Sequence, residues 1–383
     1  GLYFSDGKFE ITIFNDLHMG DKGSWDGARP KGDWSNEETI NVMNRVLDSE
    51  PSTNLAVLNG DLLSCEWVRE QDTYGLLDQV MAPLLNRKLP FATTFGNHDW
   101  AVTCNTQTMT DYIWKTANKD SQLTFTTSLV HGNTNLVGTS NYYIPVYTKE
   151  DGIDKLTMLL WFFDSKGGFK YTGDGRDNGK PENGVKSYVH EDVSNLQHQN
   201  DGRYIPSLIF VHIPILVVHQ YGRAIKYDTS LQPGVYGDSP DVQDGELGIS
   251  LLNTLAETPN ILGVFSGHLH RNDWCWKWTR TPDSAPTQWP KAANGNGLNL
   301  CFGRHTGYNG YSNVMRGGRH IVIHQAALGG DNAMETWNRL EDGTISGKVM
   351  LNSTYGQDCY PTVAIKESPP KGNVPAGRSN MGI

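Results

Sequence analysis

The sequence predicts an α/β fold in which strands and helices alternate and a second group of strands follows. Apolar runs at residues 9–15, 55–59 and 91–95 indicate three strands, and a pattern of helical period follows each of them. Beyond residue 140 the pattern changes to strands that are joined by a tight turn. Alternating strands and helices are typical of βαβ units with right-handed crossovers, so we expect a layered α/β domain.

The first half of the chain supplies the helices that follow these three strands. The first helix is predicted over residues 35–47, where Ser35 and Glu38 have the spacing of a capping box. The second and third helices are predicted at residues 72–86 and 109–117. Together with the strands, these helices complete the βαβ pattern.

The second half of the chain contains the strands of a second sheet. Residues 142–147 and 156–163 have the pattern of a hairpin, whose turn lies at residues 150–152. A strand at residues 208–211 precedes a helix at residues 246–257. Further strands are predicted at residues 261–265, 321–324 and 348–351.

Three segments without an apolar period are predicted to be surface loops, at residues 166–186, 222–245 and 279–297. Long loops in compact domains are often functional, and we expect the first two to rim a cleft. No strong boundary divides the chain, so we expect a single domain over residues 1–367, with its C-terminal extension packed on it. Residues 368–383 have no apolar pattern and are expected to form a loosely ordered tail.

Composition and charge exclude two broad classes of protein. The formal net charge of -10 argues against a protein that holds nucleic acid on a broad basic surface. No run of about 18 or more apolar residues occurs, so we expect no membrane span. A small phosphorylated substrate remains compatible with this acidic balance.

The five cysteines lack the Cys-x-x-Cys spacing of a structural zinc site. Two of them follow neighbouring predicted strands, and two others flank a loop, so disulfides between them are expected and Cys359 is left over. The expected pairs are Cys65–Cys104 and Cys275–Cys301. Five reduced cysteines are the alternative. Disulfides and the glycosylation sequon Asn352-Ser353-Thr354 both favour secretion.

Five short motifs follow predicted strands, and together they carry enough ligands for two metal ions. In chain order they are Asp16-Leu17-His18, Gly60-Asp61, Gly96-Asn97-His98-Asp99, His212 with Pro214, and Gly267-His268-Leu269-His270. The carboxyl ends of neighbouring strands meet at one edge of an open α/β sheet, so we expect these residues to converge. Carboxylate, amide and imidazole groups offer the mixed oxygen and nitrogen donors that several metals accept.

The spacing within the motifs supports this interpretation. Asp16 and His18 alternate along a strand end and so share a face, and the last motif repeats that alternation with two imidazoles. Each motif alone has a structural explanation, since Asp61 would cap a helix and Asn97 would form a turn. Five such motifs in order make a purely structural explanation the weaker one.

In these motifs the chain resembles the calcineurin-like metallophosphoesterase superfamily. All five motif blocks of that superfamily are present in order over residues 9–270, and the local strings are most similar to its fungal purple-acid-phosphatase-related branch. Two later strings, residues 272–275 and 300–308, also resemble that branch. The resemblance implies a four-layer αββα sandwich with two central mixed β-sheets and a metal site at the carboxyl ends of the strands.

The resemblance also implies the ligands of two metal ions that share Asp61. The expected sets are Asp16, His18, Asp61 and His270 for one ion, and Asp61, Asn97, His212 and His268 for the other. In such sites a shared water supplies hydroxide as the nucleophile. We expect His98 to stabilise the phosphoryl oxygens or protonate the leaving alkoxide, and Asp99 to orient its ring. The cofactors are two divalent or mixed-valence ions, for which Zn, Mn, Fe and Ca all remain open.

The leading hypothesis is a secreted, extracellular phosphoesterase that prefers phosphodiesters, such as a polymeric glycerol-phosphate or sugar-phosphate chain, because the two long loops suit an extended cleft. The alternatives are an acid phosphomonoesterase, a nuclease and, from a different class, a non-catalytic metal-binding protein. We expect a phosphate-ester substrate, no stable nucleic-acid partner, no membrane association and a monomer.

Overall fold

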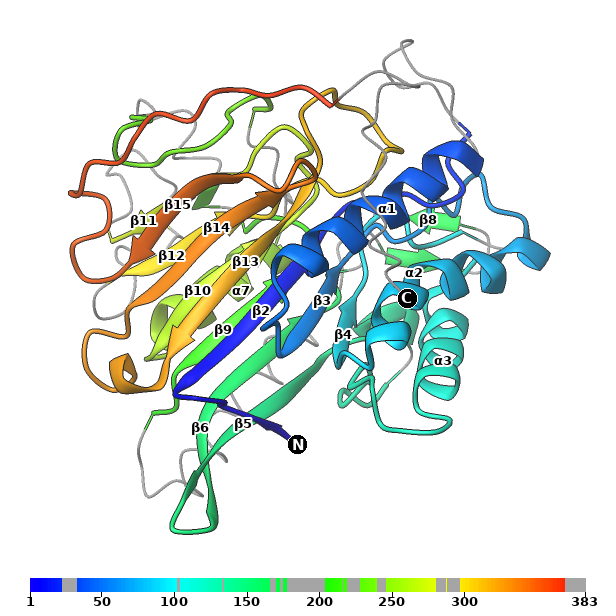
Figure 1. Cartoon of the computed structure of the whole chain (residues 1–383). Coiled ribbons are helices and arrows are strands. Elements are labelled where there is room, and N and C mark those ends of the chain that lie inside the picture. The colour runs from blue at the N-terminus through cyan, green and yellow to red at the C-terminus, as the bar shows by residue number, and fades with distance from the viewer. Residues whose placement is uncertain are drawn as a thin grey trace, which may run out of the picture.

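The computed structural model contains two large β-sheets that face each other (Figure 1). It describes residues 1–22, 33–101, 104–132, 134–165, 170–172, 175–177, 204–215, 217–218, 228–239, 246–279, 287 and 297–368.

The first sheet has six strands in the order β15-β14-β13-β2-β3-β4. They are β2 (Lys8–Phe14), β3 (Leu55–Asn59), β4 (Phe91–Thr94), β13 (Gly317–His324), β14 (Met334–Leu340) and β15 (Ile345–Leu351). The strands β2, β3 and β4 are parallel, as the predicted βαβ units require, whereas β13, β14 and β15 are antiparallel to their neighbours. The sheet is therefore mixed.

The second sheet has seven strands in the order β1-β5-β6-β9-β10-β12-β11. They are β1 (Leu2–Tyr3), β5 (Tyr142–Glu150), β6 (Ile153–Phe163), β9 (Ser207–Val211), β10 (Ile261–Ser266), β11 (Cys275–Trp278) and β12 (Leu298–Phe302). The predicted hairpin is the antiparallel pair β5 and β6, and β6, β9, β10 and β12 run parallel to one another. This sheet is mixed as well.

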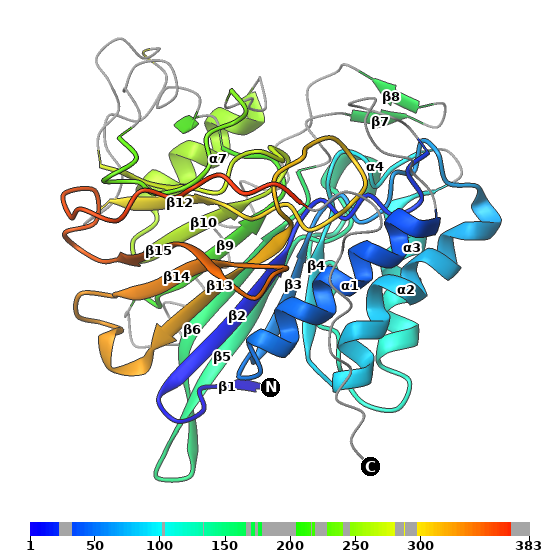
Figure 2. The same ribbon diagram turned by 45° about the horizontal axis from the view of Figure 1, so that its top comes forward.

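Helices cover the outer faces of both sheets, so the four-layer αββα prediction is confirmed (Figures 1 and 2). The helices α1 (Asp33–Ser49), α2 (Thr73–Arg87) and α3 (Thr106–Ala117) pack on the six-stranded sheet through an apolar cluster that includes Met43, Leu77 and Ile113. On the far side, α7 (Glu246–Glu257) packs on the seven-stranded sheet through Leu252 and Leu255.

The inner faces of the two sheets form a third apolar cluster. It contains Ile11 and Val57 from the six-stranded sheet and Leu160, Phe210 and Phe265 from the seven-stranded sheet. All five side chains are fully buried. Because this core holds the two sheets together, the loops at the strand ends have a fixed frame.

Several local predictions differ from the structure. The capping box at Ser35 and Glu38 is wrong, because α1 already includes Asp33 and Ser35 lies in its first turn. The surface loop predicted at residues 166–186 contains the short ladder of β7 (Lys170–Thr172) and β8 (Gly175–Asp177), and its other residues beyond 165 lie outside the described part. The strands β1, β11, β12 and β14 were not predicted, since they are short or do not alternate clearly.

The two expected disulfides are present. Cys65 is bonded to Cys104, Cys275 is bonded to Cys301, and Cys359 is an exposed free thiol. The first disulfide joins the loops that follow β3 and β4, and the second joins a cross-strand pair of β11 and β12. The alternative prediction of five reduced cysteines is therefore wrong. The predicted tail lies outside the described residues from 369 onward.

Candidate metal centre

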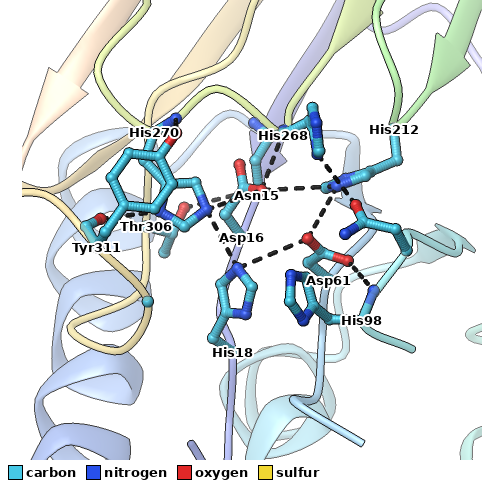
Figure 3. A network of polar contacts seen from close by, with 12 residues as sticks. Asn15, Asp16, His18, Asp61, His98, His212, His268, His270, Thr306 and Tyr311 are labelled. Carbon is cyan, nitrogen blue, oxygen red and sulfur yellow. Dashed lines mark hydrogen bonds and ion pairs between the residues drawn. The ribbon is translucent and has the colours of Figure 1, made fainter. Parts of the chain in front are cut away.

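The seven predicted metal ligands gather at one end of the two sheets. Each of them follows the carboxyl end of a strand: β2 carries Asp16 and His18, β3 carries Asp61, β4 carries Asn97, β9 carries His212, and β10 carries His268 and His270. Figure 3 shows six of these side chains pointing toward one another from both sheets. The convergence that the sequence predicted is therefore present.

Asp16, His18 and His270 form a first group of donors, whose ligand atoms all lie within 4.8 Å of one another. The Nε2 atoms of His18 and His270 are 3.1 Å apart, and Nε2 of His270 lies 3.5 Å from Oδ1 of Asp16. The carboxylate of Asp61 borders this group, because its Oδ2 is 3.6 Å from Nε2 of His18.

Asp61, His212 and His268 form a second group, whose ligand atoms also lie within 4.8 Å of one another. Nε2 of His212 lies 3.0 Å from Oδ2 of Asp61, which is the same oxygen that faces His18. Nδ1 of His268 lies 3.0 Å from Oδ1 of Asn97, which adds an amide oxygen to the group. Asp61 thus belongs to both groups.

Hydrogen bonds on the outer side of the rings decide which nitrogen faces the centre. Nδ1 of His212 donates to the carbonyl of Asn59 at 2.9 Å, and Nδ1 of His270 donates to the carbonyl of Tyr311 at 2.8 Å. In a neutral ring this leaves the lone pair on Nε2, directed into the centre. Such outer contacts are the usual way in which proteins orient metal-binding histidines.

These donors fit a pair of metal ions. The fully buried Nε2 of His212 faces Oδ2 of Asp61 at 3.0 Å, so the pair needs either a proton on His212 or a metal cation between the two atoms. Nε2 of His18 and Nε2 of His270 also face each other at 3.1 Å. Electron-rich atoms at such separations repel one another unless a cation lies between them, and nitrogen and oxygen donors of this kind suit Zn, Mn or Fe.

The charges of the buried groups depend strongly on one another. Burial disfavours the charged ring of His212, but the Asp61 carboxylate outweighs it and raises the pKa of His212 to about 10. Burial also holds the pKa of His18 well below its usual value, with Asp61 opposing this effect. Without metal, a proton on His212 therefore offsets the two carboxylates, and metal cations would replace that proton.

The backbone at the centre is strained where the ligands are presented. Four ligand residues that are not glycine have positive φ angles: Asp16 at 56°, His18 at 51°, Asp61 at 51° and His268 at 71°. Such angles are uncommon for residues with a Cβ atom and cluster at functional sites. Gly96 is needed for the close approach, because a Cβ there would lie 2.2 Å from Oδ1 of Asp61.

Comparison with known families decides what kind of protein carries this centre. The family model for calcineurin-like phosphoesterases matches residues 9–272. The chain belongs to the calcineurin-like phosphoesterase family. The resemblance found in the motifs is thereby confirmed, and the chain is a metal-dependent phosphoric ester hydrolase of this family.

Curated relatives and a solved structure agree with this family. The chain is 24% identical over 364 residues to "Probable inactive purple acid phosphatase 14" of Arabidopsis thaliana, covering 88% of this chain and 82% of that protein. It is 26% identical over 361 residues to "Phosphatase DCR2" of Saccharomyces cerevisiae, covering 88% of this chain and 54% of that protein. A dimetal phosphatase structure from Danio rerio has the same fold, with a TM-score of 0.52 and 11% identity over 90% of this chain and 99% of that one.

His98 of this phosphoesterase stands beside the shared carboxylate. Its backbone N–H donates to Oδ1 of Asp61 at 2.7 Å, and the centroid of its ring lies 4.9 Å from the centroid of the His18 ring. Nδ1 of His98 lies 2.5 Å from Oε1 of Glu66. The acidic partner of His98 is therefore Glu66, five residues after Asp61.

Asp99 has another role than the predicted one. It is fully buried, and its carboxylate accepts the backbone N–H groups of Leu63 at 2.9 Å and Gly96 at 2.8 Å. Burial, together with the charge of Asp61, raises its pKa to about 7. Asp99 thus joins the loops after β3 and β4, and the expectation that it would orient the His98 ring is corrected.

Several residues at the centre have no motif that could have revealed them. Ser64 contacts Nδ1 of His18 at 3.0 Å, and Tyr311 stacks on the His270 ring at a centroid distance of 4.1 Å. The ring of His305 also packs against the ring of His270, at a centroid distance of 4.0 Å. Tyr311 and His305 lie more than 30 residues after His270, so only the folded chain brings them to it.

Proposed function

We propose that the chain is a binuclear-metal phosphoesterase that hydrolyses phosphate esters. Its two ions would be held by Asp16, His18, Asp61 and His270, and by Asp61, Asn97, His212 and His268. The observation that carries this proposal is the position of the Asp61 carboxylate, which borders both groups of donors. Two such ions supply positive charge to the phosphoryl oxygens and acidify water.

We assign the other roles in the reaction to His98, Glu66 and Asp99. Nδ1 of His98 contacts Glu66, so Nε2 is the atom that would hold the proton for the leaving alkoxide. The contact with Glu66 would fix the orientation of the His98 ring, so that Nε2 points away from Glu66. Asp99 would keep the loop of Asn97 and His98 against the loop of Asp61 through its two backbone hydrogen bonds.

A phosphodiester is the preferred substrate class in this proposal. A monoester carries two negative charges near neutral pH and gains from additional Lys or Arg groups, whereas a diester carries one. In the described part of the chain, neither carboxylate of the centre forms an ion pair with Lys or Arg, and their ion-pair partners are histidines. Two ions would neutralise the single charge of a diester without the help of Lys or Arg, so the proposal includes a polymeric glycerol-phosphate or sugar-phosphate chain.

An extracellular location is part of the same proposal. Two disulfides persist most readily in an oxidising compartment, and both are built into the strand ends or strands of this fold. None of the described helices combines the length and the apolar character that crossing a bilayer requires. Treatment of the intact chain with glutathione at cytosolic ratios should leave both disulfides oxidised, as thiol labelling and mass spectrometry would report.

Hydrolysis assays test the proposal directly. The metal-reconstituted chain is expected to cleave bis-p-nitrophenyl phosphate with a higher kcat/KM than p-nitrophenyl phosphate. A preference for the monoester would overturn the diester assignment. Full metal occupancy without cleavage of either compound would favour a non-catalytic metal-binding protein; the Arabidopsis relative is named a probable inactive phosphatase. An Asn97→Ala variant with full activity would overturn the ligand assignment.

A further inference from the structure

We propose that a cavity at the opposite end of the seven-stranded sheet binds a neutral polyhydroxyl ligand, such as a monosaccharide unit or a polyol. The cavity has a volume of about 250 Å³. Its polar lining includes Asn260, Lys277, Asn299, Asp331, Asn332 and Ser353. The strand β10 begins at the cavity with Ile261 and ends at Ser266, roughly 17 Å away and next to the metal centre. The two sites are therefore separate.

Asn299 offers the cavity an unused hydrogen-bond acceptor. Its side chain is 7% exposed, and its Nδ2 donates to the carbonyl of Leu262 at 2.8 Å. Its Oδ1 is buried and has no hydrogen-bond partner in the described part of the chain. A buried acceptor without a donor is unfavourable by about 1–3 kcal/mol, so a ligand hydroxyl that donates to it would be bound favourably.

Lys277 offers a donor next to that acceptor. It is the cross-strand partner of Asn299 in the antiparallel pair β11 and β12, so both side chains lie on one face of the sheet. Its ammonium group donates to the carbonyls of Asn352 at 2.5 Å and Ser353 at 3.2 Å. An ammonium group has three N–H bonds, and the third can serve a ligand oxygen.

The charges around the cavity favour a neutral ligand. Burial lowers the pKa of Lys277, and the carboxylates of Asp331 and Asp358 near its ammonium group oppose this shift. Two carboxylates beside one ammonium group repel an anion, and the ammonium group repels a metal cation. A hydroxyl group avoids both penalties, because it accepts from Lys277 and donates to Asn299 or Asp331.

The apolar part of the lining suits the carbon skeleton of such a ligand. Ile261, Leu262 and Leu351 line the cavity and are almost completely buried. Their methyl groups offer contact to the C–H bonds of a sugar or polyol. The volume lies below that of sites for drug-sized molecules, which limits the ligand to about one sugar ring.

Saturation-transfer NMR on the metal-loaded full chain tests this site, with D-glucose, D-galactose and glycerol as the probes. We expect saturable binding of at least one probe, and an affinity about tenfold lower in the Asn299→Leu variant, which lacks the acceptor. Absence of saturable binding for all three probes, or equal binding by the variant, would overturn the site. Tighter binding of inorganic sulfate that depends on Asn299 would overturn the neutral class of ligand.

A second variant guards against a folding defect in Asn299→Leu. Gly330 lines the cavity, and a Cβ there would meet only the carbonyl oxygen of Ala327, at 3.7 Å. Gly330→Phe should therefore fold and abolish probe binding by filling the cavity. The control is Gly75→Phe on α2, where a Cβ would meet nothing within 4 Å and binding should persist. Phosphoester hydrolysis should be unchanged in both variants, so failure of this site and failure of the metal centre can be told apart.

Discussion

The two sheets contribute different chemistry to the metal centre. The oxygen donors all come from the six-stranded sheet: Asp16, Asp61 and Asn97. The seven-stranded sheet contributes imidazoles: His212, His268 and His270. Each proposed ion takes ligands from both sheets, so metal binding would link the sheets at the strand ends in addition to the apolar core between them.

The two halves are also held in place by different means. On the six-stranded side, three of the four proposed ligands have positive φ angles, namely Asp16, His18 and Asp61, whereas on the seven-stranded side one of the three, His268, has a positive φ angle. On the seven-stranded side, ring hydrogen bonds to backbone carbonyls hold His212 and His270. We infer that the anionic half is preorganised by its backbone and the imidazole half by its ring contacts, and four experiments can break or sharpen this contrast.

The largest effect is expected from Asp61→Asn, because this carboxylate serves both ions. Loss of a charge that binds two ions should lower kcat/KM for bis-p-nitrophenyl phosphate by about 1000-fold or more, which corresponds to roughly 4 kcal/mol. Elemental analysis should find both ions depleted. The one-sided variant His212→Ala should deplete one ion more than the other.

The matched control for this experiment is Asp6→Asn, an exposed turn residue with a similar φ of 49°. Asparagine tolerates such an angle, so the control should keep its activity and both ions. Retention of both ions by Asp61→Asn would show that this carboxylate does not bridge the two halves.

A smaller effect on turnover is expected from the pair of Glu66 and His98. His98→Ala should lower kcat by about 100-fold, as loss of a proton donor does, and Glu66→Gln by about tenfold through the orientation and charge of the His98 ring. Metal content should stay unchanged in both variants. Glu70→Gln, a neighbouring change on the η1 turn (Glu70–Asp72), is the control and should have no effect. Metal loss in Glu66→Gln would mean that Glu66 supports the ions and not the proton donor.

Removal of the ions tests whether they link the two sheets. Ligands from both sheets exist as a group only in the folded chain. Each ion present at about 100 times its Kd therefore stabilises the folded chain by about 2.7 kcal/mol, and the two ions together by about 5 kcal/mol. Chelation should then lower Tm by about 5 °C in a calorimetric scan. The same chelator should leave the Tm of Asp61→Asn almost unchanged. An equal drop in both proteins would contradict a link through the shared carboxylate.

The sequence predicted where the proposed ligands lie better than it predicted the residues that contact and orient the site. Asp16, Asp61 and His268 follow apolar runs in a regular order, so strand periodicity places them at one edge before any coordinates are known. Glu66 could not be assigned, because the contact with His98 depends on how two loops cross. The strands β12 and β14 were missed for another reason: most of their side chains are buried, which removes the alternation of polar and apolar residues.

The smallest expected effect comes from the two disulfides, which test the difference between the two halves of the metal centre. They close loops of similar length but lie in different surroundings. They close loops of 39 and 26 residues, and loop entropy predicts a loss of about 4 kcal/mol in the free energy of unfolding for removal of either. Only Cys65 is adjacent to the catalytic loops, since its N–H donates to the carbonyl of His98 at 2.9 Å. The Cys65→Ser/Cys104→Ser variant should therefore also lower kcat, by about tenfold, as Glu66→Gln does.

The Cys275→Ser/Cys301→Ser variant should lose a similar amount of stability and keep its kcat. Its two positions remain paired by the β11 and β12 ladder, and this pair belongs to the apolar core between the sheets. Denaturant titration and steady-state kinetics on both double variants separate the two effects. Equal losses of kcat would show that the loops of the six-stranded sheet are held by the fold as a whole and not by their own cross-links, and the proposed difference between the two halves of the centre would then be wrong.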